Sequence, residues 1–327
     1  MLSRRIFCRL IAGLLLFVAT SLFALDVKGI NYISLAQYAG MTGMKYKTLV
    51  RGKKMSVFSA YQSVSFEINS KVATVNGRYV NLGHPVASYR GMLYVSKRDV
   101  YKTLAPVLFP HQLKNPRIPF HIVIDAGHGG RDNGAENKRL GIKEKNINLD
   151  IALRLGNALK QMGYRVSYTR TKDFFIDLEH RPVIANRRKA DLFISIHSNS
   201  VANASVSGVE TYALTPVWLP SSSSSKLRKA DTESYPGNNV DGWSQLLSYS
   251  IQRSLVDGTN SGDRGARRAR FAVLRTATMP ACLVEVGFVS NRAECSKLAN
   301  KSYRQSVANA IARGVVRYAS VVRRCKK

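Results

Sequence analysis

The sequence is poor in cysteine and in acidic residues, and each shortage excludes a class of protein. Only 4 cysteines occur in 327 residues, and none has the close spacing of a cysteine-ligated structural zinc site. Only 20 residues are acidic against 50 that are lysine or arginine, so the formal charge is +30. Apart from the stretch 264–270, the basic residues are scattered. The excess therefore predicts a general attraction to an anionic partner and indicates no particular binding motif.

The apolar run from Leu10 to Val18 is too short for a membrane span, which needs about 20 residues. It follows three arginines and precedes small residues up to Ala24. Residues 1–24 therefore predict an export signal, so we expect the protein in the periplasm or cell envelope, attached to the membrane only while this segment is uncleaved. Export argues against nucleic acid as the partner. An anionic membrane surface and an anionic cell-wall polymer both fit the charge.

Three cysteines remain after the predicted export signal, namely Cys282, Cys295 and Cys325. Cys282 lies in an apolar stretch, and we expect it to be a small core residue. Cys295 and Cys325 could pair in an oxidising envelope, which would leave one thiol over.

Residues 25–115 predict a small β-rich α+β module. Strands are expected at Ser65–Ile68, Val72–Val75 and Met92–Ser96, with a hairpin turn at Asn76-Gly77 and a short helix at Val100–Leu108. The segments Val75–Leu82 and Gly91–Val95 resemble the small module named after the N-terminal domain of copper amine oxidases. We expect the module to bind the cell wall or to act as a spacer.

Residues 118–327 form a second predicted domain, which follows a proline-containing linker. Apolar strands are expected at Ile122–Ile124, Tyr164–Tyr168, Asp191–Ile196, Gly208–Leu214, Phe271–Leu274 and Ala281–Val286. Amphipathic helices are expected at Lys143–Met162, Asp177–Lys189, Trp243–Val256 and Tyr303–Arg323. The alternation predicts an α/β domain, with a mostly parallel sheet that has helices on both faces. The serine-rich stretch 215–241 interrupts the alternation and predicts a flexible surface insertion.

Four chemically capable side chains occur at the ends of these elements. His128 and His197 each end a predicted strand, Glu285 lies near the end of another, and Glu144 opens the long helix. The carboxyl ends of parallel strands meet at one edge of a sheet, where ligands bind. Four residues from separate parts of the chain can therefore converge there.

Two histidines and one carboxylate form a recurring zinc set for hydrolysis, which leaves one position open for water. A further carboxylate must then take a proton from the water and pass it to the leaving nitrogen. Glu285 suits that role, because an acid in an apolar strand is costly unless it is paired or has a function. Each residue also has an ordinary structural interpretation: Glu144 as a helix-start acid, His197 as a core histidine and Glu285 as the partner of an arginine.

The motifs themselves resemble a known family. They are Asp125–Gly130, Glu144-Lys145 leading into Asn148-Leu149, Ser195–Asn199, Asp263–Gly265, Phe271–Arg275 and Val284–Phe288. In this order they resemble the zinc-dependent N-acetylmuramoyl-L-alanine amidases of the third amidase family. The resemblance implies one zinc ion on His128, Glu144 and His197, with Glu285 as the catalytic acid and base. It also implies the substrate, peptidoglycan, cleaved at the amide between the lactyl group of muramic acid and the first L-alanine of the stem peptide.

Other residues in or beside these motifs have further candidate roles. Arg264, Arg275 and Asn199 are candidate substrate-binding residues, although a structural salt bridge is an equal alternative for each arginine. Asp125 is expected to orient a metal ligand and not to bind metal itself. In some relatives a helix at the place of the 215–241 insertion blocks the site until an activator protein displaces it. This insertion does not predict a firm helix, so autoinhibition stays open.

Two other functions stay open at this point. A zinc peptidase that cuts within the stem peptide would use the same ligands, and a non-catalytic wall-binding protein would share the basic surface. The intact ligand set argues against the second alternative.

Overall fold

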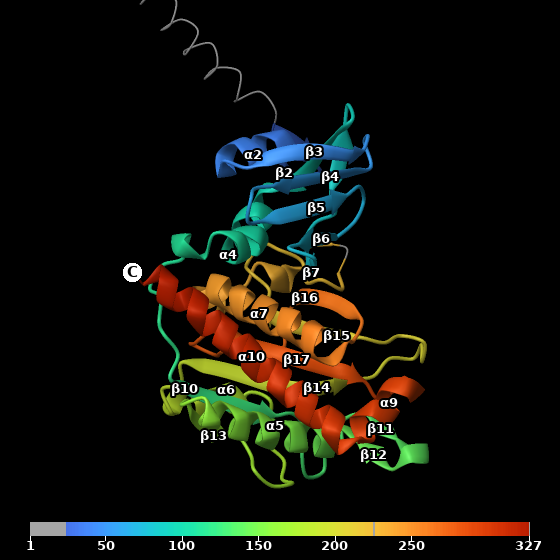
Figure 1. Cartoon of the computed structure of the whole chain (residues 1–327), viewed down its shortest axis with the longest axis vertical. Helices are drawn as coiled ribbons and strands as arrows, with labels where there is room; N and C mark the ends of the chain where they lie inside the picture. Colours follow the sequence, from blue (N-terminus) through green and yellow to red (C-terminus); the bar gives the residue numbers. More distant parts are fainter. Residues whose placement is uncertain (1–23, 225, 327) are drawn as a thin grey trace, which may run out of the picture. The chain divides into compact units, whose positions relative to one another are not determined.

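The computed structural model describes residues 24–224 and 226–326. The predicted export segment lies outside these residues, apart from Ala24. The chain divides into two compact units (Figure 1): the first contains the residues up to Gly77 together with His84–Val100, and the second contains Arg78–Gly83 and Tyr101–Lys327. No helix in the described part of the chain combines the length and the apolar character that crossing a membrane requires.

The first unit consists mainly of antiparallel strands. One sheet has the order β1 (Ala24–Val27), β2 (Ile30–Ser34), β9 (Met92–Ser96) and β8 (Ala87–Tyr89). A second series runs β6 (Val72–Val75), β5 (Ser63–Glu67), β4 (Lys54–Phe58) and β3 (Lys45–Val50). Helix α2 (Leu35–Thr42) begins at Ser34, whose hydroxyl accepts a hydrogen bond from the Gln37 amide. The strands expected at 65–68, 72–75 and 92–96 are all present. Asn76 and Gly77 both have positive φ, which fits the expected turn.

The second unit contains the sheet that positions the candidate site. Its strand order is β13 (Arg165–Tyr168), β10 (His121–Ala126), β14 (Leu192–Asn199), β17 (Ala281–Phe288), β15 (Val209–Leu214), β16 (Asp263–Ala269) and β7 (Arg78–Asn81). Neighbouring strands are parallel except for β15 and β17, which are antiparallel. The predicted mostly parallel α/β sheet is therefore confirmed.

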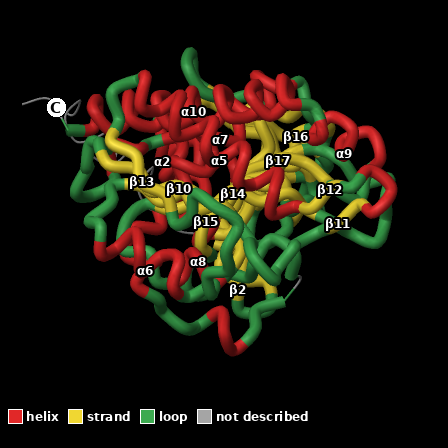
Figure 2. The backbone as a smooth tube through the Cα atoms, turned by 90° about the horizontal axis from the view of Figure 1, so that it is seen from below, coloured by secondary structure: helices red, strands yellow, loops and turns green. Residues whose placement is uncertain are grey.

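The helices cover the two faces of this sheet unequally. Three long helices lie on one side, α5 (Glu144–Gln161), α7 (Asp241–Thr259) and α10 (Lys301–Cys325), and two short ones on the other, α6 (His180–Arg187) and α8 (Ala272–Arg275) (Figure 2). Along β14, Ile194 and Ile196 pack into the core beneath the long helices, whereas Phe193 faces the short ones. Because side chains alternate along a strand, His197 faces the thinly covered side with Phe193.

The remaining elements of the second unit are short. They are helix α4 (Ala105–Leu108), helix α9 (Arg292–Ala299), a hairpin of β11 (Glu136–Asn137) and β12 (Ile142–Lys143), and single helical turns at Val100–Leu104, Pro110–Gln112 and Lys138–Leu140. In the first unit, α3 (Lys97–Asp99) begins the helical segment expected near residue 100.

Two expectations about secondary structure were wrong. The run Phe271–Leu274 was predicted to be a strand, but Ala272–Arg275 is the helical turn α8. A run of four apolar residues has no detectable period, and pattern alone cannot separate strand from helix at that length. Conversely, β16 was missed, because its sequence carries Asp263 and several arginines in place of an apolar run. Its pairing with β15 places these charged side chains inside a sheet.

The suggested bond between Cys295 and Cys325 is not formed. Both are free thiols in the structure, as is Cys282, which is fully buried in the core as expected. The 215–241 insertion contains helical turns at Lys229–Asp231 and Pro236–Val240. Arg270 donates hydrogen bonds to the carbonyl oxygens of Pro216 and Leu219 and pairs with Asp231, so the insertion is bound to the end of β16.

Candidate active site

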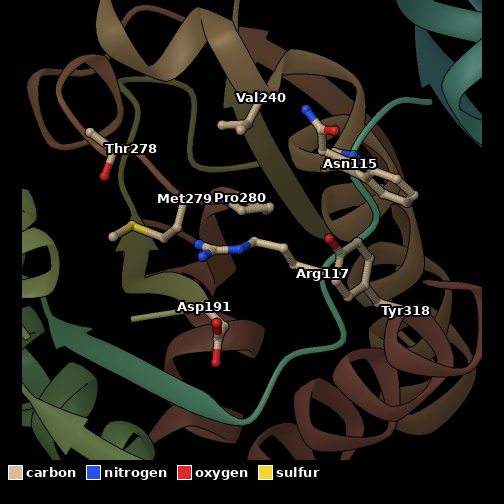
Figure 3. A pocket seen from close by; sticks show the side chains of 9 residues that line it. Asn115, Arg117, Asp191, Val240, Thr278, Met279, Pro280 and Tyr318 are labelled. Carbon is tan, nitrogen blue, oxygen red and sulfur yellow. The ribbon is translucent and has the colours of Figure 1, made fainter. Parts of the chain in front are cut away.

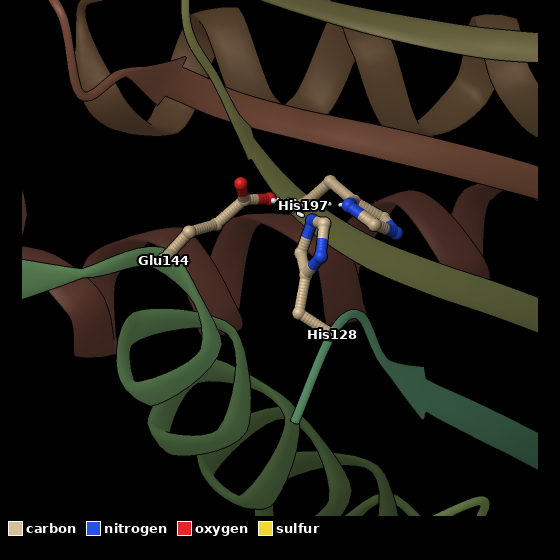
Figure 4. Close-up of side chains that lie close together, drawn as sticks. All are labelled: His128, Glu144 and His197. Atoms are coloured by element: carbon tan, nitrogen blue, oxygen red, sulfur yellow. Dashed lines mark hydrogen bonds and ion pairs between the residues drawn. The ribbon is translucent and has the colours of Figure 1, made fainter. Parts of the chain in front are cut away.

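Three side chains converge at the carboxyl ends of β10 and β14 and the start of α5. His128 Nε2 lies 3.2 Å from Glu144 Oε1, and His197 Nδ1 lies 3.1 Å from the same oxygen. Figure 4 shows the three side chains pointing toward one another from separate elements. One ligand atom of each lies within 4.8 Å of the others, a spacing that fits a single metal ion. Two imidazoles and one carboxylate are a donor set that zinc prefers.

Glycines make room for these side chains. A Cβ atom on Gly127 would lie 2.3 Å from the His197 ring, so any other residue there would displace a candidate ligand. A Cβ on Gly134 would lie 2.6 Å from Glu144 Oε2 and 2.7 Å from the His128 ring. His128 itself has a φ of 62°, in the left-handed region that side-chain-bearing residues seldom adopt. The loop after β10 is therefore shaped around the ligand side chains.

Glu144 is held as an ionised carboxylate. Its Oε2 accepts a hydrogen bond from the Ala135 amide, and its Oε1 accepts hydrogen bonds from the Ser198 amide and from Asn148 Nδ2. Burial by itself would raise the pKa of Glu144, but the contacts with His128 and His197 outweigh it and hold the pKa well below its usual value. A buried anion between two imidazoles provides the charge that a divalent cation would neutralise.

The second nitrogen of His128 is also held. Its Nδ1 lies 2.7 Å from Asp132 Oδ2, an arrangement that orients the ring and leaves Nε2 directed at Glu144. The sequence analysis missed Asp132. Its spacing of four residues after His128, within the same glycine-rich loop, was the available signal.

Asp125 reaches the ligands indirectly. Its carboxylate is fully buried and accepts hydrogen bonds from Thr169 Oγ1 at 2.6 Å, Ser195 Oγ at 2.7 Å and Arg181 Nη1 at 2.9 Å. Arg181 in turn donates to the carbonyl oxygen of His128 at 3.0 Å. Asp125 therefore contacts Arg181, which holds the backbone of the His128 loop, and this position is compatible with the expected role of orienting a ligand.

A second buried arginine holds the same loop. Arg170 donates to the carbonyl oxygens of Ala126 and Gly127, and also to that of Lys145 at the start of α5. It thereby ties the loop of one ligand to the helix of another. Sequence reasoning missed both arginines, because an arginine in an exposed loop and a buried one look alike in a sequence.

Glu285 lies beside this cluster on the same face of the sheet. It is the register partner of His197 on the neighbouring strand. Its Oε2 is shielded from solvent and has no hydrogen-bond partner among the described residues. Burial raises the pKa of Glu285 well above its usual value, and the charges of Glu144 and Glu210 add to the rise.

Glu210 is a site residue that the sequence analysis missed. It lies directly opposite Glu285 on β15 and is almost fully buried. Arg264 Nε and Arg267 Nη1 donate to its Oε2 at 2.9 and 2.7 Å. Asn199 Nδ2 and the Tyr212 hydroxyl each donate to its Oε1 at 2.8 Å. Its strand, Val209–Leu214, gives no motif that singles out this acid.

The candidate substrate-binding residues are placed as follows. Arg264 and Asn199 both bind Glu210 and lie on the open face beside Glu285. Arg275 lies apart from them, where its Nε donates to the carbonyl oxygen of Arg270 and its guanidinium covers the Tyr235 ring.

The small cavity in Figure 3 is separate from the candidate site. Arg117, Asp191, Pro280 and Tyr318 are among its lining residues, so it lies where β14 and β17 begin. The ligand cluster lies where β10 and β14 end, at the opposite edge of the sheet. The chemistry of the chain is therefore concentrated at the carboxyl edge, as expected for a parallel sheet.

Similarity to known proteins identifies the family of this chain. Residues 122–317 match the family described as N-acetylmuramoyl-L-alanine amidase. The N-acetylmuramoyl-L-alanine amidase AmiA of Escherichia coli (strain K12) is 32% identical over 218 residues, which cover 60% of this chain and 75% of that protein.

Solved structures give the same result for the second unit. The N-acetylmuramoyl-L-alanine amidase from Clostridium difficile 630 superposes with a TM-score of 0.53 at 32% identity, over 62% of this chain and 98% of that one. The CwlD amidase from Clostridioides difficile, solved in complex with the GerS lipoprotein, superposes with a TM-score of 0.52 at 29% identity, over 62% and 99%. This chain therefore belongs to the N-acetylmuramoyl-L-alanine amidase family, and it is a hydrolase of peptidoglycan.

Proposed function

We propose that this amidase works with one zinc ion held by His128, Glu144 and His197, and that Glu285 is its catalytic acid and base. The observation that carries the proposal is the shared contact of Glu144 Oε1 with both histidine nitrogens, next to a carboxyl group that has an unpartnered oxygen. The donor types and their spacing fit zinc. Bound zinc would act as a Lewis acid that polarises the amide carbonyl, and it would activate water at neutral pH.

The protein residues then have distinct tasks. Glu285 takes a proton from the attacking water and delivers it to the nitrogen of the leaving L-alanine. Its buried surroundings raise its pKa, which suits a group that must both accept and release a proton. Asp132 keeps the His128 ring in position, while Arg170 and Arg181 hold the backbone that carries this ring. In this proposal the glycopeptide binds on the face of the sheet that carries His197 and Glu285.

The cleaved bond in this proposal joins the lactyl group of N-acetylmuramic acid to the first L-alanine of the stem peptide. Cleavage there releases intact stem peptides from the glycan, a reaction that serves cell-wall remodelling or the separation of daughter cells. The predicted export segment at 1–24 supports a location in the periplasm or cell envelope. The excess of basic residues favours a polymer that carries many stem carboxylates.

The first unit is proposed to bind the cell wall or to act as a spacer. Strand β3 is exposed along its whole length and presents Tyr46 and Lys47, and the Tyr61 side chain nearby in the chain is 93% exposed. Exposed aromatic and basic groups are suited to contact with an anionic glycopeptide.

An activator protein acting on residues 215–241 is also proposed. The solved complex of the CwlD amidase with the GerS lipoprotein shows that one amidase of similar fold has a protein partner. In this chain, Arg270 binds the insertion at three of its carbonyl oxygens, so a partner that captured Asp231 would loosen the insertion.

A digest of purified peptidoglycan tests the proposed reaction. We expect the zinc-loaded protein to release intact stem peptides, identified by mass spectrometry, and a chelator to stop the release. Products cut inside the stem would instead indicate a zinc peptidase. Binding to the wall without any product, at full zinc occupancy, would indicate a non-catalytic protein.

A further inference from the structure

A row of side chains extends from the candidate metal site across three strands of the sheet. His197 on β14 is in register with Glu285 on β17, and Glu285 is in register with Glu210 on β15. Residues directly opposite one another lie on the same face of a sheet. The three side chains therefore share the thinly covered face, and the row leads away from the metal ligands toward β16.

Two arginines stand at the end of this row. Arg264 and Arg267 on β16 both donate to Glu210 Oε2, so one carboxylate is shared between two guanidinium groups. The side chain of Glu210 is only 2% exposed, whereas those of Arg264 and Arg267 are 32% and 17% exposed. This group therefore carries an excess positive charge that partly reaches solvent, on the same face as Glu285.

The guanidinium groups also have spare donors. Each arginine offers five N–H donors, of which the contact with Glu210 uses one. Arg264 Nη1 also donates to the carbonyl oxygen of Ser207 at 3.5 Å, and Arg267 Nε is shielded from solvent. The remaining terminal nitrogens of the two arginines are the donors left for a ligand. The planar fork of N–H donors on one guanidinium fits a carboxylate, so the donors that Glu210 leaves unused suit a second carboxylate.

Aromatic rings fix the direction of both guanidinium groups. Arg264 lies 5.0 Å from the centre of the Phe288 ring, and Arg267 lies 5.5 Å from the centre of the Tyr212 ring. Phe271 packs edge-on against Tyr212, with ring centres 5.1 Å apart. Arginines stacked on aromatic rings are held in place and lose little conformational freedom when a ligand binds.

The spacing matches a stem peptide. β16 lies two strands from β17, which is about 10 Å at the usual strand spacing. An extended peptide advances about 3.3–3.6 Å per residue. The two guanidinium groups themselves reach back to Glu210 on β15, which is one strand, or about 5 Å, from β17. A stem that leaves Glu285 at its first residue and crosses β15 therefore brings a carboxylate of its second or third residue to the two arginines.

We propose that Arg264 and Arg267 bind a carboxylate of the stem peptide beyond the cleaved bond, and that Glu210 positions both guanidinium groups for this contact. The proposal rests on the proposed function, because it takes the stem to lie across the face that carries Glu285. Arg264 and Arg267 are specificity-determining residues in this arrangement, and Glu210 is a positioning residue that does not touch the substrate.

The test uses synthetic muramyl peptides in matched pairs. One pair carries the second residue either as D-glutamate, with its free α-carboxylate, or as the corresponding amide. Another pair carries a third residue with or without a side-chain carboxylate. For each peptide, kcat and KM are measured with the zinc-loaded enzyme, and the dissociation constant of the released stem is measured by calorimetry.

For Arg267→Gln and Arg264→Gln, we expect KM for the recognised carboxylate peptide to rise roughly tenfold or more, with kcat and the matching neutral peptide little changed. In one of the two peptide pairs, the difference in KM between the charged and the neutral peptide should disappear in these variants. That pair shows whether the second or the third residue supplies the carboxylate. Glu210→Gln should show the same selective rise. Arg317→Gln, an exposed position on α10, is the charge-matched control and should change neither peptide. Equal losses on charged and neutral peptides would overturn the proposal.

Binding of the released stem separates this proposal from the proposed function, because it requires no cleavage. Wild-type protein that binds the charged stem at least tenfold more tightly than the neutral one, with this preference abolished in Arg267→Gln, supports the subsite even if hydrolysis fails. Equal affinity for both stems contradicts the subsite even if hydrolysis proceeds.

Discussion

Glu285 and Glu210 lie directly opposite each other on the antiparallel strands β17 and β15, yet their surroundings differ sharply. Glu210 accepts hydrogen bonds from two arginines, an asparagine and a tyrosine. Glu285 Oε2 has no partner among the described residues, and burial raises its pKa. One carboxylate is thus committed to structure, while its neighbour is left available for proton transfer. Neither residue type nor position in the strand distinguishes the two acids.

Replacing Glu285 by glutamine should abolish hydrolysis but preserve metal binding. The variant keeps the size of the side chain and removes its ability to accept and release a proton. General acid–base catalysis contributes a factor of about 10²–10⁴ to the rate. The measurement pairs a peptidoglycan digest with the zinc content of the purified protein. Glu179→Gln, at an exposed position before α6, is the control. Normal digestion by Glu285→Gln would refute the acid–base assignment.

Replacing His128 by alanine should abolish both metal binding and hydrolysis. This change removes one of three ligands and leaves Asp132 without the ring it orients. Added zinc should raise the melting temperature of the wild type, because a ligand that binds only the folded state stabilises it. The same zinc should leave the melting temperature of His128→Ala almost unchanged. An equal rise in both proteins would place the metal elsewhere.

Alanine at position 127 should weaken metal binding although it replaces none of the candidate ligands. Its Cβ would lie 2.3 Å from the His197 ring, so the ring must move away from Glu144. Zinc affinity, measured by competition with a chromogenic chelator, is expected to fall by at least tenfold, equivalent to about 1.4 kcal/mol. Gly40→Ala in α2 is the matched control, since no atom lies within 4 Å of its Cβ. Unchanged zinc affinity in Gly127→Ala would contradict this prediction, because it would show that the loop moves to accommodate the Cβ atom.

The buried pair of Asp125 and Arg181 should contribute to stability in a pH-dependent way. Asp125→Asn leaves Arg181 charged and unpaired in the interior, which typically costs about 3–5 kcal/mol of unfolding free energy. Burial alone would raise the pKa of Asp125, but Arg181, Thr169 and Ser195 hold it below its usual value. The contribution is therefore complete above the ordinary value of 3.8 and is lost as the pH falls through the lower folded-state pKa.

Urea unfolding at pH 7 and at successively lower pH values measures this dependence. The difference in unfolding free energy between wild type and Asp125→Asn should be large at neutral pH and should decrease only well below pH 4. Asp177→Asn, in an exposed pair with His180, should lie within about 0.5 kcal/mol of wild type throughout. A gap that is independent of pH would mean that packing, and not charge, explains the loss.

The helices and strands that depend on local residue patterns could be predicted from the sequence. The long helices α5, α7 and α10 follow from apolar residues at helical spacing, and β10, β14 and β17 were predicted from short apolar runs that are typical of buried strands. Because parallel strands end at one edge, the order of these strands and helices is enough to predict that His128, His197 and Glu285 lie together. Glu144 joins them because it is the first residue of α5.

The strands and side-chain contacts that depend on partners far apart in the chain became visible only in the tertiary structure. The charged sequence of β16 is typical of a loop, and this segment is a strand because it pairs with β15. Glu210, Arg170 and Arg181 bear on the site because of partners on other strands and loops, and no local period encodes those distances. A carboxylate or guanidinium acquires its role from what neutralises it, and that neighbour is chosen by the packing of the whole sheet.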